Sequence, residues 1–218
     1  MNKTLQRRTL GRLALGSVLL AGAALGFVAP ARAADETPDA LVTRLSSDVL
    51  DTIKADKSIK SGDIDKIMVL VDTKIMPNVD FLRMTASAVG PAWRTATPEQ
   101  RQRLEAEFKT LLVRTYAGAL NQVSDQTVTV RPFRGSTDDK EVLVRSEVRG
   151  GGGDPVQLDY RLVKAPDAAG GWKIYNINVM GVWLVDTYRT QFAQQINSKG
   201  IDGLIAALAA RNKSNGRS

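Results

Sequence analysis

The sequence predicts an α+β fold in which a curved four-stranded antiparallel sheet is wrapped by helices. Two patterns in the 218 residues predict it. Apolar residues recur every three or four positions over residues 38–120 and again over residues 184–210, as in helices that bury one face. Over residues 127–179 they alternate with polar residues, which indicates antiparallel strands with one buried and one solvated face. Helices, then strands, then helices is an α+β order.

Four helices are expected before the sheet, and two of them have clear start signals. Thr37 followed by Pro38 is typical of an N-cap with proline at the first helical position. Thr97 and Gln100 form a capping box around Pro98 at the start of the fourth helix. The four expected helical segments are 38–53, 64–75, 80–90 and 97–120.

Four strands are expected, joined by loops that suit hairpins. Their segments are 127–131, 141–148, 156–163 and 172–179. The second loop contains four consecutive glycines, Gly150 to Gly153, between two strands rather than before a helix. It is therefore a turn and not a phosphate-binding loop. Two helices, 184–198 and 202–210, are expected to close the chain on either side of Gly200.

Residues 1–33 have the layout of a cleaved signal peptide. A basic segment reaches Arg12, an apolar stretch covers residues 13–28, and Ala31-Arg32-Ala33 is a typical cleavage signal. The apolar stretch is shorter than the roughly 20 residues that span a bilayer. Export to the periplasm is therefore expected, by the Sec or the twin-arginine route. Residues 34–210 are expected to form a single domain, followed by a basic flexible tail at 211–218.

The net charge of +7 suggests a nucleic acid or an anionic membrane as a partner, but its distribution argues against both. Five of the 30 cations lie in residues 1–33 and three in residues 211–218, which leaves 22 cations and 23 acids in residues 34–210. The domain is nearly neutral. We therefore expect no nucleic-acid binding and little attraction to anionic lipid head groups.

The residue types that most often perform catalysis are absent. The chain has no histidine and no cysteine, which removes the commonest general base and the soft metal ligands. It contains no Walker loop, no G-x-S-x-G and no G-x-G-x-x-G sequence. We expect no catalytic residue, no metal and no cofactor, although catalysis by Asp, Tyr or Lys is left open. Apolar residues that face inward are abundant, and their pattern does not distinguish a filled core from a lined cavity.

Two segments of the chain carry distinctive motifs. The first, residues 71–123, contains Pro77, Asp80-Phe81, Gly90, Trp93, Thr97-Pro98-Glu99-Gln100-Arg101, Phe108 and Thr115-Tyr116-Ala117. The second, residues 177–208, contains Gly181-Val182, Tyr188-Arg189, Phe192 and Gly200-Ile201-Asp202-Gly203-Leu204. With these motifs, the two segments resemble the MlaC family of periplasmic phospholipid-binding proteins. Leu104 and Trp183 depart from the family pattern, which often has an aromatic and a small residue there.

The resemblance implies an NTF2-like fold with an added helical part and a carrier that shuttles phospholipid across the periplasm. The implied partners are an outer-membrane lipoprotein–porin complex and an inner-membrane ABC transporter complex with MCE-domain subunits. Our hypothesis is that the apolar face of the sheet and the aromatic helix residues line a cavity for two acyl chains. The lining residues that it names are Phe81, Met84, Trp93, Phe108, Leu112, Tyr116, Val144, Val148, Leu158, Tyr160, Val182 and Trp183. Glutamate at Val182 or Val148 should then abolish lipid binding.

Two other functions remain open on the sequence. One is an NTF2-like enzyme that acts on a small apolar substrate, and the other is a periplasmic adaptor or chaperone. Intact phospholipid in the purified protein would argue against both.

Overall fold

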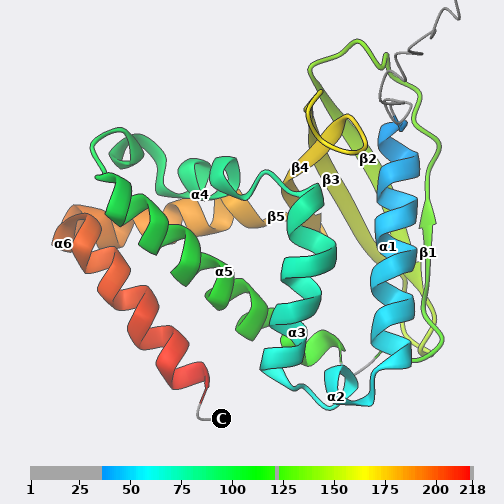
Figure 1. The fold of residues 1–218 in the computed structure, drawn as a ribbon, viewed down its shortest axis with the longest axis horizontal. Helices are drawn as coiled ribbons and strands as arrows, with labels where there is room; N and C mark the ends of the chain where they lie inside the picture. The colour runs from blue at the N-terminus through cyan, green and yellow to red at the C-terminus, as the bar shows by residue number, and fades with distance from the viewer. Residues whose placement is uncertain (1–35, 121–122, 217–218) are drawn as a thin grey trace, which may run out of the picture. The chain divides into compact units, whose positions relative to one another are not determined.

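The structure is a computed structural model that describes residues 36–120 and 123–216. The predicted signal peptide lies outside the described residues. Among the described residues, no helix combines the length and the apolar character that a membrane span requires. Figure 1 shows helices α1 to α5 preceding the sheet and α6 following it. The α+β class predicted from the sequence is confirmed.

The sheet has five antiparallel strands in the order β1-β2-β3-β4-β5. Four of them confirm the predicted segments: β1 (Thr127–Val130), β2 (Glu141–Arg149), β3 (Val156–Lys164) and β4 (Trp172–Val179). The fifth, β5 (Val182–Trp183), has only two residues, too few to show an alternating pattern in the sequence. A bulge between Arg161 and Leu162 shifts the register of β3 against β4. Such bulges bend a strand and increase its twist.

The predicted helices form, with differences at their ends. They are α1 (Pro38–Ala55), α3 (Ile64–Leu70), α4 (Phe81–Val89), α5 (Pro98–Leu120) and α6 (Leu184–Asn215). At the start of α5, the Thr97 amide donates to Gln100 Oε1 at 3.0 Å and the Gln100 amide donates to Thr97 Oγ1 at 3.2 Å. The predicted capping box is therefore present.

Short helical turns fill the segments between the long helices. The turn α2 (Lys57–Lys60) lies in a stretch too polar to show helical periodicity, and Asp56 caps it. The helix expected over residues 64–75 stays α-helical only to Leu70. It continues as a π-helical turn, η1 (Val71–Ile75), and a 3₁₀ turn, η2 (Met76–Asn78), because Pro77 cannot continue an α-helix. A further 3₁₀ turn, η3 (Gly90–Arg94), precedes α5.

The end of the chain differs from the flexible tail expected from residue 211. Helix α6 runs to Asn215 with a single kink at Gly200, where φ is +69°. Asn212 is buried, and its Nδ2 donates to Glu107 Oε2 at 2.7 Å and to the Glu107 carbonyl at 2.9 Å. Arg114 donates to the Asn212 carbonyl. These polar contacts between α5 and α6 hold the last turns of α6 in place. Apolar periodicity in the sequence cannot predict them, because the residues involved are polar.

The buried apolar residues form two clusters. The main cluster contains residues of α1, α4, α5, α6 and the sheet, and its Phe108 on α5 is fully buried. The Phe108 ring contacts Phe81, Tyr188 and Phe192, with ring centroids 5.0 to 5.7 Å apart. The second cluster joins α1, α2, α3 and α5. It consists of Ile53, Ile59, Ile67, Leu70, Val113 and Ala117.

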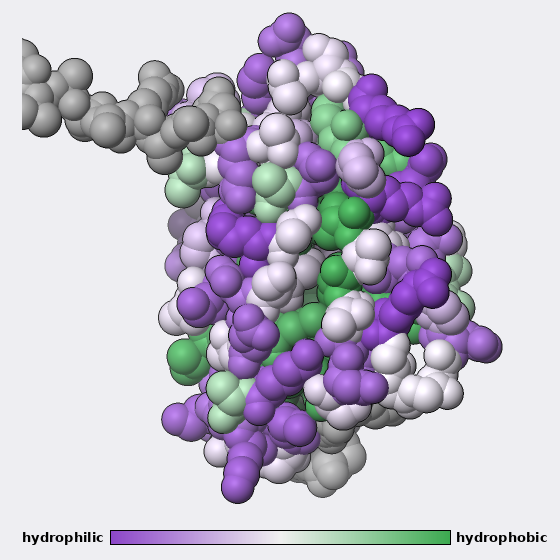
Figure 2. Space-filling model, turned by 90° about the vertical axis from the view of Figure 1, so that its right-hand side faces the viewer, coloured by the Kyte–Doolittle hydropathy of each residue, from purple (hydrophilic) through white to green (hydrophobic). Residues whose placement is uncertain are grey.

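The side of the molecule that carries α1 and β1 is mostly polar on its surface. Figure 2 shows hydrophobic residues there as a narrow vertical strip bordered by hydrophilic side chains. A large apolar hollow is not apparent on this side.

Candidate functional site

An apolar cavity of about 290 Å³ lies where the two hydrophobic clusters meet. Its lining includes Ile67, Val113 and Ala117 from the second cluster and Phe81 and Met84 from the main cluster. A junction between two cores is a natural place for a cavity, because each cluster packs on its own side.

Helix α5 supplies one wall of the cavity with a stripe of residues three or four positions apart. The residues of this wall are Lys109, Leu112, Val113, Tyr116, Ala117 and Leu120. The opposite wall is formed by α3 and the turns η1 and η2, which contribute Ile67, Val71, Ile75 and Met76. The α3 and α5 helices contact each other directly (Figure 1).

The remaining lining comes from the start of α4 and the end of the sheet. Val79 forms a parallel bridge with Ile174 of β4, and the Asp80 amide donates to the Ile174 carbonyl at 2.8 Å. Asp80 also caps α4, because its Oδ1 accepts from the Arg83 amide at 3.0 Å. These bonds hold Phe81 and Met84 at the cavity. Across from them lie Ile177 and Val179 of β4 and Leu184 of α6.

Two lining side chains carry polar groups, and both reach the surface. Tyr116 is 41 % exposed, and partial burial together with a hydrogen bond to Tyr188 raises the pKa of its phenol. Lys109 Nζ lies 2.7 Å from Asp72 Oδ1, with the two side chains 25 % and 49 % exposed. The cavity therefore has an apolar interior and a polar edge.

The chemistry of this cavity favours holding hydrocarbon over catalysis. Apart from Lys109 and Tyr116, its lining offers neither a nucleophile nor an acid or base. In the part of the chain that the structure describes, no group of three acidic, histidine or cysteine residues is arranged to hold a metal ion. Walls of this kind exclude water and favour an apolar ligand.

The structure brings four of the twelve residues named by the sequence hypothesis to this cavity. They are Phe81, Met84, Leu112 and Tyr116, from α4 and α5. Their contact with lipid stays a prediction.

Three of the others lie in the filled core. Phe108 packs against the rings of Phe81, Tyr188 and Phe192, and Val144 and Tyr160 pair across β2 and β3. Tyr160 is buried, and this burial raises the pKa of its phenol. These residues are buried, as predicted, but none of them is part of the cavity lining.

The last five lie on the sheet or at the edge of the core. Leu158 and Val148 are half-buried on the sheet, and Val182 is 52 % exposed beside Val179. The two tryptophans stack with cations, Trp93 with Arg101 at 5.3 Å and Trp183 with Arg161 at 4.0 Å from ring centroid to guanidinium carbon. Arg161 and Trp183 stack on the solvated face of the sheet, and Trp183 is not part of the cavity lining.

The lining residues that sequence reasoning missed come from several elements, among them η1, η2, α5 and the end of β4. Ile75 and Met76 precede a proline, which indicated only a helix end. Ile177 and Val179 continue the alternation of β4 and could have been named from it. Lys109 gave no signal, because a lysine within an amphipathic helix is normally on its solvated face.

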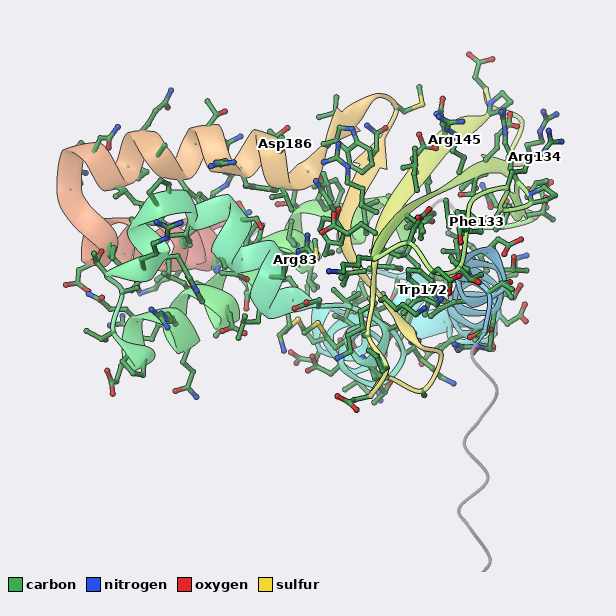
Figure 3. All side chains as sticks on the ribbon, turned by 90° about the horizontal axis from the view of Figure 1, so that it is seen from above. Arg83, Phe133, Arg134, Arg145, Trp172 and Asp186 are labelled. Carbon is green, nitrogen blue, oxygen red and sulfur yellow. The ribbon has the colours of Figure 1, made fainter. Side chains whose placement is uncertain are left out.

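Two other hollows have polar or mixed linings. One of about 690 Å³ lies over the β1–β2 loop and is lined by Phe133, Arg134 and Arg145 among others. Figure 3 shows these three together, well apart from Arg83 on α4. A hollow of about 400 Å³ contains Arg83 and Arg189. Neither has the apolar lining of the cavity beside α5.

Known proteins resemble this chain over most of its length. The family model for the MlaC protein matches residues 43–210. The toluene tolerance protein Ttg2D of Pseudomonas putida is 30 % identical over 170 residues, which cover 78 % of this chain and 77 % of that protein. The intermembrane phospholipid transport system binding protein MlaC of Haemophilus influenzae is 23 % identical over 176 residues, which cover 80 % of this chain and 82 % of that protein.

A solved structure gives the same result for the fold. The phospholipid-binding protein from Ralstonia solanacearum, solved in complex with a phospholipid, superposes with a TM-score of 0.77 and is 47 % identical. The match covers 82 % of this chain and 98 % of that one. The sequence resemblance, the family model and the fold agree: the chain belongs to the MlaC family.

Proposed function

We propose that this protein is a periplasmic phospholipid-binding component of the Mla lipid transport system and that its cavity holds the acyl chains. The observation that carries the proposal is the apolar cavity between α3, η1 and α5. The relatives support it, because one is a binding protein of an intermembrane phospholipid transport system and another was solved with a phospholipid. The same observations favour a binding protein over an enzyme.

The size of the cavity sets how much acyl chain it shelters as it stands. A methylene group takes up about the volume of a water molecule, roughly 30 Å³. A volume of about 290 Å³ therefore accommodates on the order of ten methylenes. Each methylene kept from water contributes about 0.8 kcal/mol, so these contribute roughly 8 kcal/mol.

A whole diacyl lipid needs more room. Two chains with about 30 methylenes occupy roughly 900 Å³ and contribute on the order of 24 kcal/mol when shielded from water. The walls must therefore separate as a lipid enters. Separation of α3 and η1 from α5 affects the second cluster, which holds Ile67 and Val113, whereas Phe108 and its aromatic neighbours lie within the main cluster and can stay packed.

The carrier role requires that the protein and the bilayer bind the acyl chains with similar affinity. A protein that shields the chains about as well as a bilayer does can accept and release lipid without a large free-energy change. We infer that the protein shuttles phospholipid between an outer-membrane lipoprotein–porin complex and an inner-membrane ABC transporter complex with MCE-domain subunits. The nearly neutral domain fits delivery through protein partners better than attraction to anionic membranes.

Lipid extraction followed by mass spectrometry tests the proposal. The full chain, expressed with its own leader and purified without detergent, should carry phospholipid in a fixed molar ratio. Transfer of labelled phospholipid from vesicles to the lipid-stripped protein should restore that ratio. A purified protein that retains no phospholipid and takes none from vesicles would overturn the proposal.

A further inference from the structure

Lys109 is the one charged residue that lines the cavity, and its position is unusual. The other lining residues, all in the described part of the chain, are apolar except for Tyr116. Lys109 is on α5, one turn before Leu112 and Val113, so its methylene stem runs along the apolar wall. Lysine commonly buries its stem in this way and keeps the ammonium in water. The ammonium therefore marks the polar edge of the cavity.

This ammonium is held by an acid on the opposite wall. Asp72 Oδ1 lies 2.7 Å from Lys109 Nζ. Five ion pairs occur among the described residues, and this is the one with a member in the cavity lining. Asp72 is part of the π-helical turn η1, whose Val71 and Ile75 line the cavity. The pair thus joins the two walls that have to separate.

A second observation points to a function for this turn. π-helical turns are rare and occur frequently at functional sites. The turn η1 directs Val71 and Ile75 to the cavity and places Asp72 at Lys109. A regular α-helix to residue 75 would rotate these side chains relative to α5. The turn therefore sets both the apolar wall and the ion pair.

The chemistry of Lys109 matches the phosphate of a phospholipid. When acyl chains occupy the cavity, the phosphate that follows the glycerol lies at the polar edge. An ammonium has three donors, and lysine binds phosphate as a point charge without demanding a fixed geometry. Lys109 already has an anionic partner in Asp72, and a phosphate is a second anion that competes for the same ammonium.

We propose that Lys109 binds the phosphate of the bound lipid and that Asp72 holds the ammonium until the phosphate replaces it. The inference rests on the proposed function, because it names the head-group contact of the same cavity. When the phosphate displaces the Asp72 carboxylate from Lys109, the ion pair that links η1 to α5 is also broken. Binding of the phosphate is therefore coupled to opening of the walls. A lipid without a phosphate neither binds the ammonium nor breaks the link between the walls.

Binding of two lipids with the same acyl chains tests this proposal. The probes are dioctanoyl phosphatidylglycerol and dioctanoylglycerol, titrated against lipid-stripped full-length protein. The wild type should prefer the phosphate-bearing lipid by roughly tenfold, which corresponds to about 1.4 kcal/mol. Lys109→Met keeps the stem and should remove this preference. Asp72→Asn releases the ammonium and should increase it.

Lys66→Met is the matched control. Lys66 is exposed on α3 and does not line the cavity, so the preference should stay at the wild-type value. Equal loss of both lipids in Lys109→Met would show that Lys109 only packs, and would overturn the inference. An unchanged preference in Lys109→Met would overturn it as well. Failure of the wild type to bind either lipid would instead overturn the proposed function.

Discussion

Replacement of Leu112 by glutamate should expel lipid while the fold remains intact. Leu112 is half-buried on α5 and lines the cavity, so its replacement puts a carboxylate against the acyl chains. The effective cost of burying an ion is several kcal/mol. If the carboxylate stays hydrated instead, it admits water to a cavity in which buried methylenes contribute roughly 8 kcal/mol to lipid binding. We expect lipid binding to weaken by about 3 to 4 kcal/mol, or roughly 100- to 1000-fold.

The measurement is the molar ratio of extracted phospholipid to purified protein, together with uptake from vesicles. Circular dichroism and the unfolding temperature establish that the variant is folded. Leu82→Glu is the matched control, because Leu82 is 56 % exposed on α4 and the substitution is the same. It should retain the wild-type lipid ratio.

Two results would refute the reasoning. The first is a folded Leu112→Glu protein with a wild-type lipid ratio, since the chains would then lie elsewhere. The second is an equal loss in Leu112→Glu and Leu82→Glu, since general surface charge and not the cavity would control binding. Glutamate at Val182, which the sequence hypothesis expects to abolish lipid binding, should reduce it far less than glutamate at Leu112, because Val182 is 52 % exposed and its carboxylate stays hydrated.

Three further predictions concern stability. Thr97→Ala removes half of the capping box and should lower the free energy of unfolding by about 1 kcal/mol in urea titrations, whereas serine at this position should restore it. Asn212→Ala removes two buried hydrogen bonds to Glu107 and should lower the free energy of unfolding by about 2 kcal/mol and Tm by about 4 to 8 °C; no change in Tm would mean that the end of α6 is not docked. The hydrogen bonds from Tyr175 and from Arg83 lower the pKa of Glu141 below its ordinary 4.5. The contribution of Glu141 to the free energy of unfolding is therefore present above about pH 4.5 and is lost as the pH falls through the lower pKa of the folded state. The stability difference between the wild type and Glu141→Gln should therefore be larger at pH 7 than at pH 3, and an equal difference at both would contradict this linkage.

The long helices and strands β1 to β4 could be predicted because each had a local signal. The capping box at Thr97 and the alternation of β2 to β4 are properties of a few neighbouring residues, and the structure confirms both. The π-helical turn could not be predicted in this way. Its residues fit a regular helix by periodicity, and only the packing of Val71 and Ile75 toward α5 distinguishes the two.

The end of α6 shows the same limit for polar residues. The segment from Arg211 is rich in basic and polar residues, a composition typical of a flexible tail. In the structure, Asn212 is buried and donates a hydrogen bond to Glu107, which lies 105 positions earlier in the chain. A polar contact of this range leaves no periodic pattern in the sequence.

The boundary between core and cavity is set by partners that the sequence does not place. Phe108 and Leu112 lie one turn apart on the same side of α5, so helical periodicity treats them alike. Phe108 meets the rings of Phe81, Tyr188 and Phe192 and is fully buried, whereas Leu112 faces η1 across open space. The difference arises because three aromatic side chains pack around Phe108. At Leu112, one helical turn later, η1 contributes only the aliphatic side chains of Val71 and Ile75. The aromatic cluster thus lies at one end of the cavity through Phe81, and we propose that η1, linked to α5 by Asp72 and Lys109, is the wall that moves when a lipid enters.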